Sequence, residues 1–154
     1  MNLTDQYLIF TLDEQRYAMG LSSVEKVIRA VEMNTLPEGQ DLLHGLINMQ
    51  GKIIPVINIR KHFYLPVREM DINDRIIISH ASEITVAFVV DTVEGVVEIP
   101  KKQVNKAKKI FPKLEQYIEG VGKLNDNSVL IYNMENLLST QDVDKIKDVV
   151  EEFN

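Results

Sequence analysis

The sequence contains no cysteine. This absence excludes disulfide bridges, thiol nucleophiles and cysteine-ligated zinc or iron–sulfur sites. No apolar run approaches the roughly 20 residues that a membrane-spanning helix requires. The first residues, MNLTDQYLIF, also lack the basic and apolar parts of a secretory leader. We therefore expect a cytoplasmic protein that does not insert into a membrane.

An excess of positive charge is absent too. The 154 residues include 17 basic and 23 acidic side chains, which gives a formal charge of −6. Such a chain is a poor candidate for binding nucleic acid. The lysines between residues 101 and 113 have no arginine among them and only one aromatic neighbour, Phe111. This cluster is more typical of a solvated face or a protein-contact loop than of a nucleic-acid surface.

Catalytic signatures are missing as well. The sequence has no glycine-rich phosphate loop, no nucleophile elbow and no His-Glu-x-x-His motif. His44, His62 and His80 lack a second ligand at helical spacing, so we expect no metal site. Asp91 and Glu94 could form an acid–base pair, but carboxylates beside a turn more often shape that turn. The sequence predicts no enzyme, no cofactor and no metal.

Short apolar runs separated by turn residues dominate the chain instead. They predict strands at 7–12, 16–21, 25–31, 46–49, 52–59, 75–79, 84–90, 95–99, 118–124 and 128–133. Pro55 indicates an edge or a bulge, because proline cannot donate to a strand ladder. Only the end of the chain has helical periodicity. Ser139 or Thr140 can cap this helix, and its apolar stripe comprises Val143, Ile146, Val150 and Phe153.

The strands form an internal repeat. Residues 45–63 align on 120–138 without gaps, with Gly45 on Gly120 and Asn58 on Asn133. Residues 7–29 align on 76–98 in a second register. The repeat predicts two half-size β units of about five strands, each too small to be stable alone, so the two must pack together. Small closed barrels suit such short strands, because they leave few free edges.

Several of these segments together resemble one protein family. They are FTL (10–12), YAM (17–19), VEKVIR (24–29), LP (36–37), HGLINMQGKIIPVINIR (44–60), VDTVEGVVEI (90–99), YIEGVGKL (117–124) and VLIYNMENLL (129–138). Their order and spacing are similar to CheW, the coupling protein of chemotaxis. The resemblance covers about residues 6 to 138.

The resemblance implies a mainly β fold with two packed SH3-like five-stranded β-barrels plus a C-terminal α-helix. The whole chain, 1–154, is then one CheW-like domain. Barrel 1 is expected at roughly 7–70, barrel 2 at roughly 75–134 and the helix at roughly 139–153, and the terminal strands are free to exchange between the barrels.

The function implied by the resemblance is that of a non-catalytic adaptor. CheW proteins couple the cytoplasmic tip of methyl-accepting chemoreceptors to the regulatory domain of the histidine kinase CheA. The adaptor is then recruited from the cytoplasm to receptor arrays at the membrane. A divergent CheW-like scaffold that couples a different receptor and kinase is the alternative.

The resemblance also implies two kinds of binding residue. The receptor-binding groove between the barrels corresponds to Val24, Lys26, Val27, Ile28, Gly45, Ile47, Asn48, Gln50 and Gly51. A receptor helix would place apolar side chains in this groove, although strand alternation should turn some of these residues into the core. The kinase-binding residues correspond to Val31, Met33, Leu36, Val104, Ile110 and Phe111.

Two positions depart from the family pattern. Lys26 replaces the usual glutamate, and Gln50 replaces the usual arginine of the N-x-R-G turn. If these two positions pair in other members, their joint replacement avoids leaving one charge unpaired in a partly buried groove. The departures lie where partners would bind, so they affect the choice of partner.

Overall fold

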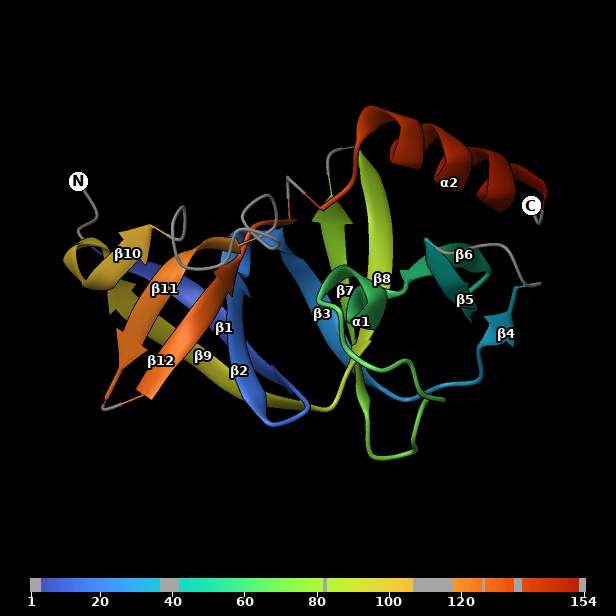
Figure 1. The fold of residues 1–154 in the computed structure, drawn as a ribbon. Coiled ribbons are helices and arrows are strands. Elements are labelled where there is room, and N and C mark those ends of the chain that lie inside the picture. The colour runs from blue at the N-terminus through green and yellow to red at the C-terminus, as the bar shows by residue number, and fades with distance from the viewer. Residues whose placement is uncertain are drawn as a thin grey trace.

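The computed structural model describes residues 4–36, 42–81, 83–106, 118–125, 127–134 and 137–152. These residues form two six-stranded sheets and a C-terminal helix (Figure 1). Sheet 1 has the strand order β10-β11-β12-β2-β1-β9. Its strands are β1 (Thr4–Leu12), β2 (Gln15–Gly20), β9 (Thr92–Pro100), β10 (Val104–Lys106), β11 (Ile118–Leu124) and β12 (Asn127–Tyr132).

Sheet 2 has the order β3-β7-β8-β6-β5-β4. Its strands are β3 (Val24–Arg29), β4 (Asn34–Thr35), β5 (Leu43–Met49), β6 (Lys52–Ile57), β7 (Arg75–Ala81) and β8 (Ile84–Val90). Three short helical segments connect strands: η1 (Leu21–Ser23), α1 (Ile59–His62) and η2 (Lys101–Gln103). The short β4 and β10 are the strands that the sequence patterns missed.

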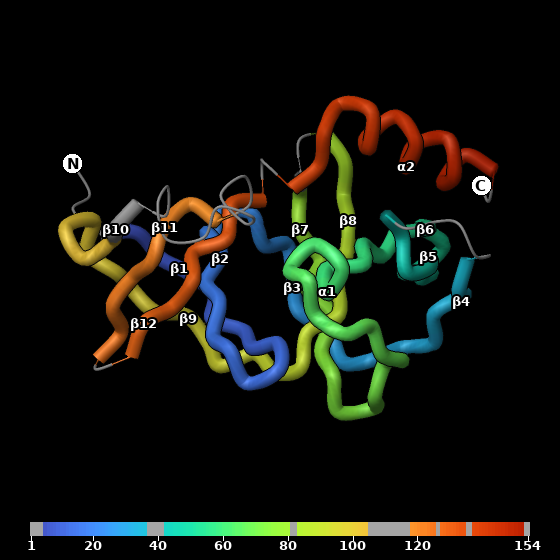
Figure 2. The backbone as a smooth tube through the Cα atoms, viewed as in Figure 1, coloured from blue at the N-terminus to red at the C-terminus, as the bar shows by residue number. Residues whose placement is uncertain are grey.

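The sheets are not consecutive halves of the chain. The first two strands pair with the last four to form sheet 1, and the six strands between them form sheet 2. Figure 2 shows β1 and β2, in blue, beside β11 and β12, in orange. The expected ranges 7–70 and 75–134 therefore do not describe the two sheets. Strand β2 joins the two ends of the chain in sheet 1, because it pairs with β1 on one side and in parallel with β12 on the other.

The strand registers reproduce the internal repeat. In sheet 2, β6 pairs in parallel with β8 through Val56–Ala87, and in sheet 1, β12 pairs with β2 through the equivalent Ile131–Ala18. The β-bulges also coincide. One bulge interrupts β5 between residues 43 and 45, and its equivalent interrupts β11 between 118 and 120. A second interrupts β3 between residues 24 and 26, and its equivalent interrupts β9 between 93 and 95. The two sheets are thus pseudo-equivalent, and each is built from parts of both repeats.

A shared hydrophobic core joins the two sheets. Phe10 of sheet 1 and Phe88 of sheet 2 are fully buried, and their ring centroids are 5.8 Å apart. Tyr17, Phe63 and Tyr132 continue this aromatic cluster. Each sheet also has a smaller core on its other face, around Ile9 in sheet 1 and Ile47 in sheet 2. Since the largest core is shared, neither sheet can bury its apolar surface alone.

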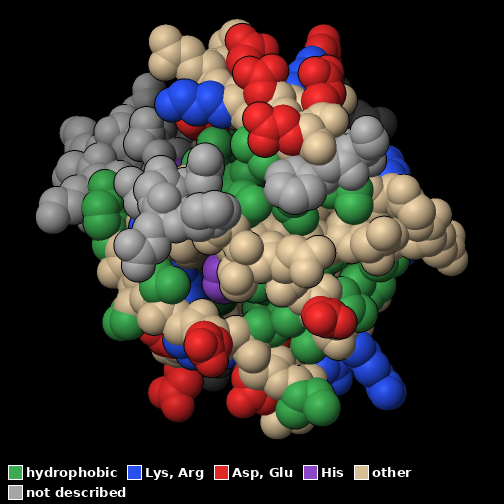
Figure 3. Space-filling model, turned by 90° about the vertical axis from the view of Figure 1, so that its right-hand side faces the viewer, with side chains coloured by type: hydrophobic (Ala, Val, Ile, Leu, Met, Phe, Trp, Pro, Cys, Tyr) green, Lys and Arg blue, Asp and Glu red, His purple; other side chains and the backbone are tan. Residues whose placement is uncertain are grey.

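The C-terminal helix α2 (Thr140–Glu152) closes the shared core. Ser139 caps it: its Oγ accepts a hydrogen bond from the Asp142 amide at 3.1 Å, and its own amide donates to Asp142 Oδ2. This reciprocal pair is a capping box. Val143 and Ile146 are buried, whereas the predicted stripe residue Phe153 lies outside the described residues. Acidic side chains, with lysines among them, lie on the outer face of α2, at the top of Figure 3.

Pro55 lies within the sheet and not at its edge. It is on β6, between β5 and β8 in the strand order. Its partner on β5 is Leu46, but the parallel pairing with β8 begins only at Val56. The proline is tolerated because the missing amide falls where β6 has a partner on one side only.

Candidate partner-binding surfaces

The edge strand β3 has two different faces. Val24 and Val27 are half-buried against the core shared by the two sheets. Ile28 packs against the smaller core of sheet 2, and Lys26 is exposed. The bulge at Glu25 allows Val24 and Val27 to lie on the same face despite their odd spacing. Val24 and Val27 therefore present part of their apolar surface at the junction of the sheets, where the receptor groove is expected.

The turn between β5 and β6 carries three of the groove residues. Gln50 and Gly51 have φ values of 55° and 87°, which is the geometry of a tight type I′ hairpin turn. The Gly51 amide donates to Asn48 Oδ1 at 2.8 Å, which fixes the turn from within. All three residues are exposed, so the tip of this hairpin is accessible.

Gly45 and Ile47 have packing roles. Ile47 is only 1% exposed in the core of sheet 2. A Cβ atom on Gly45 would lie 2.6 Å from the Asn34 carbonyl oxygen and 2.7 Å from Met33 Cγ. The glycine thus permits the close approach of β4 to β5. Gly45 and Ile47 therefore serve packing within sheet 2, and neither residue is exposed enough to contact a partner.

Lys26 and Gln50 are both exposed, and no hydrogen bond joins them among the described residues. Strands β7, β8 and β6 lie between β3 and β5 in the sheet. The pairing hypothesis assumed that both positions lie in a partly buried groove. Because both side chains are exposed, a single charge at either position would remain solvated and would not need a partner.

The described members of the expected kinase-binding set lie near equivalent edges of the two sheets. Met33 and Leu36 flank the edge strand β4 and are half-buried, and Val31 is 37% exposed. Val104 begins the edge strand β10 and is half-buried. Ile110 and Phe111 lie outside the described residues. Strands β4 and β10 stand at opposite ends of the molecule (Figure 1), so Met33 and Leu36 lie far from Val104.

A network of charges at the junction of the sheets was not foreseen from the sequence. Arg60 of α1, whose side chain is 9% exposed, donates to Asp13 at 2.9 Å and to Asp91 at 2.8 Å. Arg68 binds Asp74 through two hydrogen bonds of 2.8 Å and also contacts Asp91. We call these five residues the junction network. It ties the β1–β2 turn, α1 and the loop after α1 to the point where β8 of sheet 2 passes into β9 of sheet 1.

Asp91 is the centre of this network. Burial alone would raise the pKa of its carboxyl group. The Asp13 amide and the guanidinium groups of Arg60 and Arg68 outweigh that effect and hold the pKa below its ordinary value. Glu94, the other member of the conceivable acid–base pair, instead binds Arg16 at 3.0 Å. The two carboxylates are thus engaged with different arginines.

The histidines lie in different surroundings. Burial lowers the pKa of His44 and His62, while the exposed His80 lies 3.4 Å from the Thr85 hydroxyl. Within the described ranges, no group of three or more histidine, aspartate or glutamate residues could hold a metal ion. In the same part of the chain, no helix is both long and apolar enough to cross a membrane.

The fold defines the class of protein. Two pseudo-equivalent β-sheets share one core, a single helix closes it, and the accessible features are strand edges and a hairpin tip. This mainly β architecture with two SH3-like barrels confirms the fold expected from the sequence, with a sixth, short edge strand added to each sheet.

Comparison with known proteins defines the family. The CheW-like domain model matches residues 6–142. A chemotaxis protein CheW of Thermotoga maritima is 30% identical over 141 residues, which is 92% of this chain and 86% of that protein. The CheW of Klebsiella aerogenes is 26% identical over 94% of this chain and 87% of its own length. The crystal structure of the scaffolding protein TtCheW from Thermoanaerobacter tengcongensis superposes with a TM-score of 0.79 at 27% identity, covering 88% of this chain and 93% of that one. The chain belongs to the CheW family.

Proposed function

We propose that this protein is a cytoplasmic, non-catalytic adaptor that couples the signalling tips of chemoreceptors to the regulatory domain of a CheA-type histidine kinase. Family membership supports this function in general. The observation that carries it is the position of Val24 and Val27, which are half-buried on an edge strand at the junction of two sheets. Half-buried valines at such a junction can accept the apolar side chains of a receptor helix.

The kinase would bind at the ends of the molecule. Met33 and Leu36 lie at the β4 edge and Val104 lies at the β10 edge. These edges lie at opposite ends of the molecule (Figure 1), so each edge would bind a separate kinase domain. The adaptor would contact two neighbouring kinase molecules while the receptor occupies the groove between the sheets. Many weak contacts of this kind gain strength from their high effective concentration in an array.

A Val27→Asp variant tests the receptor surface. The charge would lie among apolar contacts, so receptor-tip binding should fall by about ten-fold or more while kinase binding stays unchanged. Val96 provides a matched control, because it occupies the equivalent position of the equivalent edge strand β9 and is 49% exposed. Val96→Asp should leave receptor binding intact.

The measurement is isothermal titration calorimetry of each variant with receptor-tip fragments and, separately, with the kinase regulatory domain. Equal loss of both partners, together with a lower melting temperature, would show that Val27 is a core residue and would refute its role as a receptor contact. Equal loss of receptor binding in both variants would show that the groove is not confined to β3.

A specialised scaffold for a different receptor and kinase is the second candidate. The departures at Lys26 and Gln50 favour it, because both side chains are exposed where a partner would bind. Restoring the family residues in a Lys26→Glu/Gln50→Arg variant distinguishes the two. Tighter binding of this variant to the organism's own chemoreceptors would favour the specialised scaffold, whereas unchanged or weaker binding would favour the chemotaxis adaptor.

A further inference from the structure

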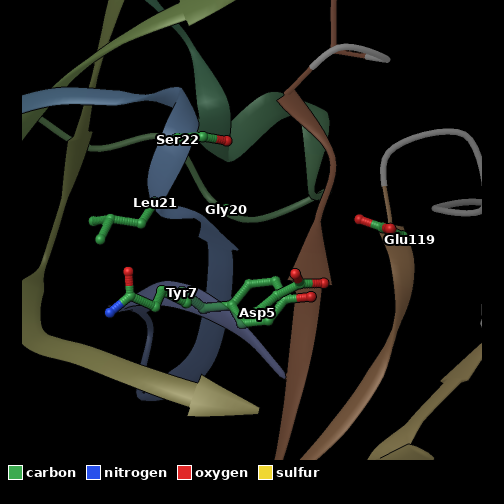
Figure 4. A pocket seen from close by; sticks show the side chains of 7 residues that line it. Asp5, Tyr7, Gly20, Leu21, Ser22 and Glu119 are labelled. Atoms are coloured by element: carbon green, nitrogen blue, oxygen red, sulfur yellow. The ribbon is translucent and has the colours of Figure 1, made fainter. Parts of the chain in front are cut away.

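An acidic cavity opens on sheet 1, and none of the residues that line it belongs to the surfaces proposed for the receptor and the kinase. Its volume is about 530 Å³. Asp5 and Tyr7 of β1 line it, together with Glu119 of β11 and residues 20–22 around η1. In Figure 4 the Tyr7 ring and the Asp5 carboxylate point to the same side of β1, the side on which Glu119 lies. None of the seven residues that line the cavity is basic.

Tyr7 contributes a polar group to the lining of the cavity. The residue is only 7% exposed, and its hydroxyl has no hydrogen bond in the part of the chain that the structure describes. The hydroxyl oxygen itself is not fully buried, so a ligand in the cavity can reach it. Burial raises the pKa of Tyr7, and the neighbouring Asp5 and Glu119 raise it further, so the hydroxyl stays neutral and its oxygen remains available as an acceptor.

The pseudo-equivalent place in sheet 2 holds an arginine side chain. Continuing the register that aligns 7–29 on 76–98, Asp5 corresponds to Asp74 and Ser22 corresponds to Asp91. Arg68 occupies that place in sheet 2, and its two terminal guanidinium nitrogens each donate to Asp74 at 2.8 Å. Under this arginine Asp74 is only 3% exposed, whereas Asp5 is exposed.

Sheet 1 has no internal counterpart of Arg68 among the described residues. Arg68 lies in the loop between α1 and β7, which follows the first repeat. After the second repeat the chain continues into α2, which packs on the other sheet, against β6. Among the described residues, sheet 1 therefore has the acceptor carboxylate of Asp5 but no arginine equivalent to Arg68, which binds Asp74 in sheet 2.

We propose that the acidic cavity binds an arginine side chain of a partner protein. The guanidinium group would pair with the Asp5 carboxylate in two parallel hydrogen bonds, as Arg68 does with Asp74. Glu119 would supply a second carboxylate and the Tyr7 hydroxyl oxygen a third acceptor. A guanidinium carries five N–H donors in a planar fork and fits this set of acceptors, whereas the ammonium of lysine cannot bind a carboxylate in parallel.

The test uses the intact protein and capped single amino acids as probes. Nα-acetyl-arginine methylamide is titrated into ¹⁵N-labelled protein, with the lysine and citrulline analogues in parallel, and amide shifts are followed by NMR. The arginine probe should give saturable shifts at Tyr7 and Glu119 with a dissociation constant of tens of millimolar or tighter. Citrulline, which has a similar shape without the charge, should bind about ten-fold more weakly.

Variants assign the site. Asp5→Asn/Glu119→Gln should weaken arginine binding by about ten-fold or more, and Tyr7→Phe by about two- to five-fold. Asp144→Asn/Asp148→Asn, which makes the same change of charge on the exposed face of α2, should have no effect.

The absence of saturable shifts, equal binding of citrulline, or indifference to the Asp5→Asn/Glu119→Gln change would overturn the proposal. Equal binding of the lysine probe would overturn its guanidinium specificity. The titration needs neither receptor nor kinase, so its failure is distinguishable from a failure of the adaptor function.

Discussion

The side chain of Asp91 links residues from both sheets. It lies where the chain leaves sheet 2 for sheet 1 and accepts hydrogen bonds from the Asp13 amide, Arg60 and Arg68. Asp91→Asn removes this charge and leaves Arg60, which is almost fully buried, with fewer partners. We expect the free energy of unfolding to fall by about 1–3 kcal/mol in urea denaturation at neutral pH. Glu94→Gln, which breaks a half-exposed pair, should cost less than about 1 kcal/mol; equal losses would contradict a special role for Asp91.

The lowered pKa of Asp91 predicts a pH dependence of stability. A carboxyl group whose pKa is lower in the folded state stabilises the fold above its unfolded pKa of about 3.9. That contribution is lost as the pH falls through the folded pKa. Unfolding free energies measured from about pH 6 to about pH 2.5 should therefore decline less steeply in Asp91→Asn than in the parent protein. Parallel curves for the two proteins would show that Asp91 does not contribute.

Gly45 tests the close approach of β4 to β5. In Gly45→Ala the new Cβ would lie 2.6 Å from the Asn34 backbone oxygen, so the edge strand must shift. We expect a loss of about 1–3 kcal/mol in stability. Gly20→Ala is the control, since its Cβ would meet nothing closer than Ser22 Oγ at 3.9 Å. If both substitutions have the same effect by thermal denaturation, β4 is not held as described.

At the scale of elements, the capping box decides where α2 begins. Ser139→Ala removes the hydroxyl that accepts from the Asp142 amide, and the expected loss is about 1 kcal/mol. Thr140→Ala at the first helical position is the control and should change stability by a few tenths of a kcal/mol. Circular dichroism during thermal unfolding measures both. A larger loss for Thr140→Ala would identify it as the true cap.

The sequence predicted the long strands and the terminal helix well, because alternation, turn residues and a capping serine are local signals. All ten segments proposed as strands overlap strands of the structure. The short edge strands β4 and β10 carry too few residues to show any period, and α1 is only a single turn. The sequence could not assign Val24 and Ile28 to opposite faces, because the bulge at Glu25 interrupts the alternation.

Strand pairing is the property of the whole molecule that local patterns could not supply. The parallel pair β2–β12 joins strands that are more than a hundred residues apart, and nothing in either strand encodes its partner. The same limit applies to the junction network, in which Arg60 and Asp13 come together only after both sheets have formed. The internal repeat was nevertheless a reliable guide, because its two registers reappear in the paired strands and in their bulges.

The shared core predicts that the two sheets unfold together. Phe10 and Phe88 belong to different sheets and have ring centroids 5.8 Å apart. A double-mutant cycle with Phe10→Leu and Phe88→Leu should give a coupling energy of about 0.5–1.5 kcal/mol. Near- and far-ultraviolet circular dichroism should report a single transition in every variant. Two separate transitions, or a coupling near zero, would mean that the sheets are independent units.

The measurement that tests the adaptor function most directly is co-sedimentation of the purified protein with receptor signalling-tip fragments and the kinase from the same organism, combined with an assay of kinase activity. We expect all three proteins to sediment together, with changed kinase activity, only when the adaptor is present. Sedimentation of the kinase with the receptor to the same extent in its absence, or binding of this protein to neither partner, would contradict the proposed coupling.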